Sequence, residues 1–126
     1  MTTFDKREEG FEKKFALDEE QKFRAGARRN KLLGLWAAEK LGKSGDAATA
    51  YAKEVIAAEF EEAGDADVVR KVTGDLSAKG VATLLITTEP ETIVAYADRA
   101  LVLRRGRLTA ELSGADLSKD QLMKNA

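Results

Sequence analysis

The sequence predicts a mainly α fold, a small helical bundle followed by a short α/β tail with a strand, a helix and a β-hairpin. Three observations predict it. Apolar residues recur near the 3.6-residue helical period through most of the first 79 positions. Residues 81–87 then form a continuous apolar, partly β-branched run of strand length. Finally, two short apolar runs flank a glycine-containing turn at 104–107, which is typical of a hairpin.

The first segment, residues 4–22, is dense in charges of both signs and carries three phenylalanines. Phe4, Phe11 and Phe15 are spaced seven and four residues apart, so on a helix they share one narrow face. Gly10 weakens such a helix by about 1 kcal/mol relative to alanine, so the free segment is expected to be helical or disordered. The residues alone leave two alternatives for this face: packing on the chain's own bundle, or docking in a groove of a partner.

The second helical segment, residues 18–41, is expected to meet the first at a bend or a functional division near Asp18. The reason is that Phe23 lies about 100° around the helix from Phe4. Trp36, with Leu32 on the same apolar face, is predicted to belong to the core. A basic cluster precedes them and fits either a solvated face or a partner contact. Its members are Arg28, Arg29 and Lys31.

Two further helices are predicted before residue 80. A loop at 43–46 separates them from the first, with Ser44 or Asp46 available as a cap. The helix over 46–61 has one apolar face, made of Tyr51, Val55, Ile56 and Phe60. After a break at 64–65, where Asp65 or Asp67 can cap, a short helix supplies Val68, Val69, Val72 and Leu76 to the core.

The tail changes character after residue 80. The run at 81–87 has the pattern of a strand buried on both faces. Residues 88–91 have the spacing of a capping box with Pro90 in the first turn, which predicts a helix to Ala97. Runs at 100–103 and 108–112 form the predicted hairpin, and a second capping box at 118–121 opens a short terminal helix.

Composition excludes several classes of function. The 126 residues include 21 Lys and Arg against 22 Asp and Glu, so no basic surplus favours nucleic acid. Cysteine and histidine are absent, which removes disulfides, thiolate metal sites and the commonest catalytic base. No apolar run approaches the ~20 residues that span a bilayer, and the first residues do not have the pattern of a secretory signal. The expectation is a soluble cytoplasmic protein with no catalytic residue, no metal, no cofactor and no membrane insertion.

Residues 37–44 match a relaxed phosphate-binding-loop pattern, with alanine in place of the first glycine. That loop needs a strand before it and a helix after it, whereas this pattern overlaps a helix C-terminus. The helix dipole would present its negative end to a phosphate. A structural C-cap that uses Gly42 as the left-handed residue is therefore favoured over a nucleotide site.

Three segments together resemble the zeta subunit of alphaproteobacterial ATP synthases, a small helical inhibitor of ATP hydrolysis by the catalytic head. They are Phe4-Asp5-Lys6-Arg7, residues 27–42, and Ala50-Tyr51-Ala52-Lys53-Glu54-Val55. The resemblance runs from Met1 to about Gly80. It implies three parts: an inhibitory segment at 1–18, a zeta-like bundle at 19–79, and an unrelated tail at 80–126, where the family would have a fourth amphipathic helix.

The resemblance also implies a partner and a mechanism. Residues 1–18 would insert at an alpha/beta interface of the ATP synthase head, near its gamma subunit, and block rotation. The expected partner-binding residues are Phe4, Phe11 and Phe15 as anchors, Arg7, Lys13 and Lys14 at the rim, and Arg28 and Arg29 on the bundle. The location implied is cytoplasmic, peripheral to the inner membrane through ATP synthase.

Residues 80–126 resemble a different family, the end of a sugar-importer-type ABC transporter ATPase domain. The order of motifs carries this resemblance: the strand, the helix at Thr88-Glu89-Pro90-Glu91, residues 97–103, Arg105-Gly106-Arg107 and Ala110-Glu111-Leu112. In that family the phosphate-binding loop and the catalytic glutamate lie upstream of this part. Two alternatives to the inhibitor remain: a nucleotide-binding module or inactive ABC ATPase fragment, and an assembly protein whose tail supplies a docking surface.

Overall fold

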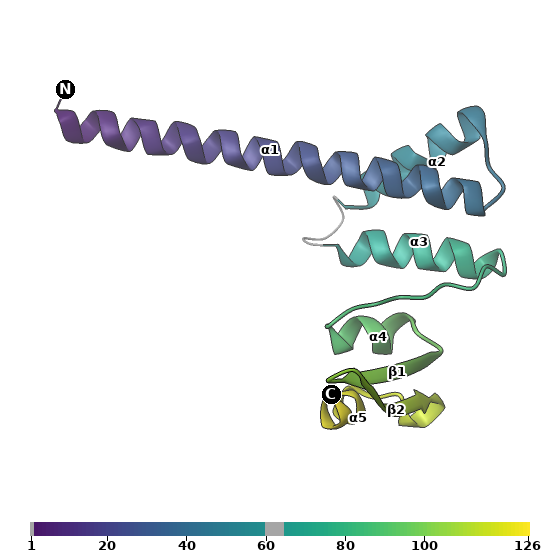
Figure 1. Cartoon of the computed structure of the whole chain (residues 1–126). Coiled ribbons are helices and arrows are strands. Elements are labelled where there is room, and N and C mark those ends of the chain that lie inside the picture. Colours follow the sequence, from purple (N-terminus) through teal and green to yellow (C-terminus); the bar gives the residue numbers. More distant parts are fainter. Residues whose placement is uncertain (1, 60–64) are drawn as a thin grey trace. The chain divides into compact units, whose positions relative to one another are not determined.

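The computed structural model describes residues 2–59 and 65–126 (Figure 1). Within these residues the chain forms two compact units, Met1–Val72 and Thr73–Ala126. Helices dominate, and the strands form one two-stranded antiparallel sheet. The predicted fold class, a helical bundle followed by a short α/β tail, is confirmed.

Helix α1, Thr3–Lys40, contains most of the first unit's helical residues. It begins with a capping box in which the Asp5 backbone N–H donates to Thr2 Oγ1 at 3.3 Å and the Thr2 N–H donates to Asp5 Oδ2 at 3.1 Å. The helix continues through Asp18 without a break, so the expected bend is absent (Figure 1). The helix includes Gly10, and a Cβ atom added there would meet nothing within 4 Å.

Helix α2, Gly45–Ala58, packs on the C-terminal third of α1, with Ser44 in the N-cap position but without a side-chain cap bond. Tyr51 and Val55 are buried as predicted, and Ile56 is half-buried. Phe60 and Gly64, at the predicted end of this helix and the following break, lie outside the described residues.

The buried face of α1 is not the predicted one. Trp36 is 49% exposed and Leu32 is 56% exposed. Each lies two residues from Gly34, about 160° around the helix from the side that contacts α2. The buried side carries small or polar residues that let the two helices approach closely: Asn30, Gly34, Ala37 and Ala38. The core assignment of Trp36 was therefore wrong.

Helix α3, Ala66–Ala78, starts directly after Asp65 and has Asp67 in its first turn. Three of its four predicted core residues are buried, and Val69 is half-buried. The buried ones are Val68, Val72 and Leu76. The end of the helix belongs to the second unit.

The second unit is built on a hairpin. Strands β1, Arg99–Arg104, and β2, Arg107–Ser113, are joined by Arg105 and Gly106, whose φ angles of 50° and 78° fit a two-residue type I′ turn. Helix α4, Pro90–Tyr96, and helix α5, Lys119–Asn125, close a small core on one face of the hairpin. A short 3-10 helix, Gly114–Asp116, precedes α5. The core side chains are Ala100, Val102, Leu112 and Leu122.

The caps of the two tail helices differ. Ser118 caps α5, with its Oγ accepting from the Gln121 N–H at 3.2 Å. The reciprocal bond of the predicted capping box does not form, because the Ser118 N–H donates to the Asp116 carbonyl at 3.0 Å. At α4, Pro90 stands in the first turn as predicted, but the N-cap residue is Glu89 and no side-chain cap bond forms. The Lys119 ammonium joins the helices by an ion pair of 2.6 Å to Glu91, and the hydrogen bond to that ammonium lowers the pKa of the Glu91 carboxyl.

The predicted strand over residues 81–87 is wrong as secondary structure, because no ladder forms there. Leu84 and Ile86 are 85% and 87% exposed instead of buried. The apolar, β-branched composition matches a central strand, but a strand exists only when a neighbour pairs with its backbone. Within the described residues no neighbour does so.

Candidate functional site

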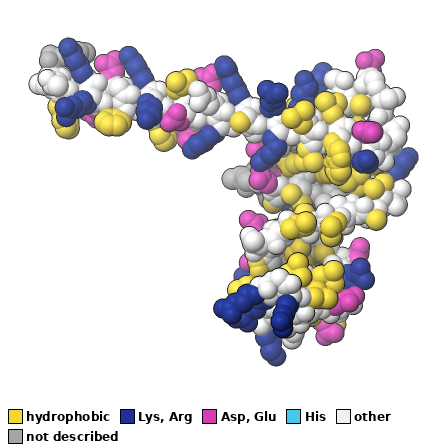
Figure 2. Space-filling view, viewed as in Figure 1, with side chains coloured by type: hydrophobic (Ala, Val, Ile, Leu, Met, Phe, Trp, Pro, Cys, Tyr) yellow, Lys and Arg dark blue, Asp and Glu magenta, His cyan; other side chains and the backbone are white. Residues whose placement is uncertain are grey.

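The N-terminal half of α1 presents a row of exposed aromatic rings. Phe4, Phe11 and Phe15 are 75%, 73% and 69% exposed, although each belongs to a regular helix. Their spacing places them along one face, and hydrophobic side chains gather along one edge of this N-terminal arm (Figure 2). We call these three residues the aromatic row. A shallow depression beside it is lined by Phe4, Arg7, Glu8, Phe11 and Glu12.

The predicted rim cations differ in how they are paired. Lys13 Nζ lies 3.4 Å from Glu9 Oε1, in an exposed i, i+4 pair that contributes little stability. In the part of the chain that the structure describes, Arg7 and Lys14 have no ion-pair partner. These two cations therefore reach solvent with their charges uncompensated, both on the same side of the aromatic row, about 60–80° around the helix from Phe4.

The two arginines predicted to bind a partner from the bundle have different surroundings. Arg28 is exposed and has no ion pair among the described residues. Arg29 instead turns to its own chain, with a guanidinium nitrogen 2.8 Å from Asp65 Oδ1 and 3.7 Å from Glu59 Oε1. Half of the Arg29 side chain remains exposed, so it can still meet a partner at its outer edge.

Asn30, beside Arg29, is the centre of a polar network that the sequence did not indicate. It is fully buried, and its Nδ2 donates to Glu59 Oε2 at 2.7 Å. Its Oδ1 accepts from Arg29 Nε at 3.2 Å and from Arg29 NH2 at 3.1 Å. A buried amide needs such partners, so this network fixes α1 against the end of α2. The sequence signal was weak: a single asparagine, one turn before Gly34 on a small-residue face.

The segment that resembles a phosphate-binding loop forms a Schellman C-cap. Leu41 is the C-cap residue of α1, and Gly42 follows with a φ of 75°. The Lys43 N–H donates to the Ala38 carbonyl at 2.8 Å, and the Gly42 N–H to the Glu39 carbonyl at 3.1 Å. Lys43 Nζ lies 5.4 Å from the centre of the Tyr51 ring. These backbone donors are occupied, so the predicted C-cap is confirmed.

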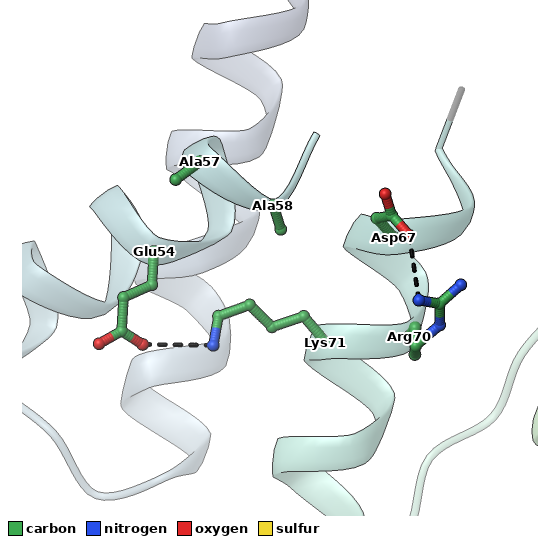
Figure 3. A pocket seen from close by; sticks show the side chains of 6 residues that line it. All are labelled: Glu54, Ala57, Ala58, Asp67, Arg70 and Lys71. Carbon is green, nitrogen blue, oxygen red and sulfur yellow. Dashed lines mark ion pairs between the residues drawn. The ribbon is translucent and has the colours of Figure 1, made fainter. Parts of the chain in front are cut away.

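A pocket of about 360 Å³ lies between α2 and α3 in the first unit (Figure 3). Lys71 of α3 reaches across to Glu54 of α2, with a nitrogen–oxygen distance of 3.2 Å. Arg70 turns back to Asp67 of the same helix at 3.2 Å. The remaining lining residues are Ala57 and Ala58. Of the two ion pairs in the pocket, the Lys71–Glu54 pair joins α3 to α2, whereas the Arg70–Asp67 pair lies within α3.

Over residues 2–59 and 65–126 the structure contains no cluster of three or more acidic side chains that could hold a metal ion. None of the described helices is long and apolar enough to cross a bilayer. The aromatic row is therefore the strongest candidate site on the described surface.

Comparison with known proteins gives two kinds of match. The model of the family described as ATPase inhibitor subunit zeta matches residues 1–100. A solution NMR structure is 58% identical, with 59% of this chain and 79% of that chain covered and a TM-score of 0.43. The family match agrees with the first resemblance, although it extends past the boundary expected near Gly80.

The second kind of match is to ribose import ATP-binding proteins. The protein RbsA 1 of Streptomyces coelicolor is 40% identical over 55 residues, which is 44% of this chain and 11% of that protein. RbsA of Roseobacter denitrificans is 30% identical and RbsA of Jannaschia sp. is 35% identical, each over 63 residues, 50% of this chain and 12% of the relative. The chain thus spans about an eighth of the length of these curated relatives.

Proposed function

The chain belongs to the ATPase inhibitor subunit zeta family, and from this premise we propose that it inhibits ATP hydrolysis by the catalytic head of ATP synthase. In this proposal residues 1–18 enter an alpha/beta interface of the head, near the gamma subunit. A wedge in an interface that must open and close stops rotation without touching the reacting groups. The chain then acts as a regulator rather than an enzyme, takes no cofactor, and is held by ATP synthase at the cytoplasmic side of the inner membrane.

The single observation that supports this mechanism best is the aromatic row on a helix that is already formed. Burying a phenylalanine removes about 150–250 Å² of surface from water, and apolar burial contributes about 25 cal/mol per Å². Three rings that are about 70% exposed therefore offer on the order of 10 kcal/mol before the costs of association. Aromatic anchors of this kind are typical of helices that dock in grooves.

The charges support an acidic rim around such a groove. Arg7 and Lys14 are uncompensated and lie beside the row. Lys13 lies about 180° around the helix from Phe4, so it could exchange its exposed partner Glu9 only for a carboxylate on the opposite wall of the groove. On the bundle, Arg28 is the cation more available to the outside of the head, because Arg29 already serves the Asn30 network. Rim charges of this kind mainly set the association rate and its dependence on salt.

The test is inhibition of ATP hydrolysis by purified ATP synthase head. Deletion of residues 1–18 should abolish inhibition while the remaining chain keeps its helical circular dichroism. Phe11→Ala should weaken inhibition by at least tenfold, which corresponds to about 1.4 kcal/mol. The matched control is Leu17→Ala, because Leu17 is also exposed on α1 but lies on the far side of the helix from Phe15.

These outcomes can contradict the proposal. Full inhibition by the deleted chain would remove the site from residues 1–18. Equal effects of Phe11→Ala and Leu17→Ala would show that apolar contact is not confined to the aromatic row.

The alternative is a nucleotide-binding module or an inactive ABC ATPase fragment, favoured by the likeness to ribose import ATP-binding proteins. Titration with ATP and magnesium tests it, with the fluorescence of the half-exposed Trp36 as the signal. A saturable change that disappears in Lys43→Ala would support this alternative at residues 37–44. A change that persists in Lys43→Ala, or no change, would count against that segment.

A further inference from the structure

The second unit leaves an apolar segment without backbone partners. Residues 82–86 make no backbone hydrogen bond to any described residue, and the chain runs there as an open trace (Figure 1). Leu84 and Ile86 are 85% and 87% exposed. No charged residue occurs from Val81 to Thr88. A short, uncharged, β-branched segment with free N–H and C=O groups is the kind of chain that adds to a sheet.

Strand β1 offers the complementary surface. The sheet has only two strands, so β1 pairs with β2 on one side and, within the described residues, with nothing on the other. Residues 100–103 are uncharged, so a neutral strand can lie beside them without burying a charge. A cavity of about 360 Å³ separates the chain's own segment from the start of β1, and no backbone hydrogen bond between described residues crosses it. Its lining consists of residues 81–85, residues 96–99, Leu101, and Thr73 and Ser77 of α3.

We propose that residues 81–87 of a second copy of this chain add as a third strand to the open edge of β1, and that the two copies exchange these segments reciprocally. The lengths agree, because β1 has six residues and the segment has seven. A two-stranded hairpin is marginal alone, and a third strand stabilises it. The exchange is two-fold symmetric, so it closes as a dimer and leaves neither segment exposed.

Light scattering on the full chain, coupled to size-exclusion chromatography over a wide range of concentration, tests the proposal. The expected particle has twice the 13.7 kDa mass of the chain. Hydrogen exchange supplies the second measurement: alternate amides within residues 82–86, those that face β1, should be protected in the dimer and unprotected after dilution. Thr83→Pro should give a monomer, because proline removes a donor N–H and blocks strand addition without removing apolar surface.

The control is Leu108→Lys, which adds a charge to an exposed side chain of β2 away from the proposed pairing edge. This variant should remain dimeric. A chain that stays monomeric at all concentrations overturns the proposal. So does a dimer that persists in Thr83→Pro, or one in which residues 82–86 exchange freely. A dimer lost in Leu108→Lys but kept in Thr83→Pro would assign the contact to the sheet face instead.

Discussion

Gly34 of α1 packs directly against the backbone of Ala52 in α2. A Cβ atom at Gly34 would lie 2.7 Å from Ala52 Cα, 3.2 Å from Ala52 Cβ and 3.3 Å from Val55 Cβ. The first distance is shorter than real Cβ contacts allow, and its partner is backbone that cannot rotate away. The hydrogen at Gly34 is thus what permits the two helices to approach as they do.

The first prediction is that Gly34→Ala destabilises the first unit. In an ordinary helix interior, replacing glycine by alanine stabilises by about 0.5–1 kcal/mol. Here overpacking costs about 1–3 kcal/mol and outweighs that gain. Urea unfolding monitored by circular dichroism should show a lower midpoint. Gly10→Ala is the control on the same helix, where nothing lies within 4 Å, and its midpoint should not fall. An unchanged midpoint for Gly34→Ala would mean that α1 and α2 pack less closely.

The second prediction concerns the buried amide of Asn30. Asn30→Ala removes the 2.7 Å bond to Glu59 and should cost about 1–3 kcal/mol in the free energy of unfolding. Because the two side chains act as a pair, Asn30→Ala, which removes the donor, and Glu59→Ala, which removes the acceptor, should not be additive in a double-mutant cycle. The coupling should be on the order of 1 kcal/mol, measured by urea unfolding of the four proteins. Strict additivity would show that this bond contributes nothing of its own.

The third prediction follows from the exposure of Trp36. Because 49% of the residue already contacts water, Trp36→Ala should cost on the order of 1 kcal/mol. A fully buried tryptophan would cost about 3–5 kcal/mol. The fluorescence emission of the folded chain should resemble that of a partly hydrated indole and shift only slightly on unfolding. A blue-shifted emission together with a large loss of stability would place Trp36 in a core after all.

The fourth prediction is a pH dependence at the start of α1. The hydrogen bond from the Thr2 backbone N–H, and then that from the Thr2 side chain, lower the pKa of Asp5 below its ordinary 3.8. The pKa of Asp5 is lower in the folded helix than in the unfolded chain. The ionised carboxylate in the capping box therefore stabilises the helix at pH values above the unfolded pKa. This contribution disappears as the pH falls through the lowered pKa. NMR titration of the Thr2 and Asp5 amides should show one step below pH 3.8, absent in Asp5→Asn. A midpoint at or above 3.8 would mean that the box does not form in solution.

Local signals in the sequence were sufficient for the tail hairpin, for the C-terminal end of α1 and for the start of α5. Arg105 and Gly106 were predictable as a turn because few residues accept positive φ, and Gly42 was predictable as a C-cap for the same reason. Such features depend on residues adjacent in the chain. The start of helix α5 was equally predictable, since Ser118 Oγ accepts from the Gln121 N–H within one turn.

Features that depend on distant partners were harder to predict. Leu32 and Trp36 gave the stronger apolar signal, yet the contact with α2 uses Asn30 and Gly34, because close approach favours small volume over hydrophobicity. The prediction of a strand at residues 81–87 was wrong for a related reason. Its composition favours a strand, but a strand also needs a neighbouring strand to pair with, and the composition does not show whether one is present. In the candidate site, the aromatic row was visible from spacing alone. The hydrogen bonds of Arg29 to Asn30 could not be predicted in this way, because they depend on the positions of Glu59 and Asp65 in the folded chain.

Because α1 is unbroken, it fixes both the distance of the aromatic row from Asn30, which we call its reach, and the direction in which the rings point around the helix axis. From Asn30, where the helix is fixed, to Thr3 is 27 residues, or about 40 Å at 1.5 Å per residue. Removing seven consecutive residues from the part of α1 between Phe15 and Asn30 would shorten this reach by about 10 Å and preserve the direction of the rings to within about 20°. Removing two would shorten it by only about 3 Å but turn the rings by about 160°. Depth of insertion and orientation are thus separately adjustable by the number of residues in one helix.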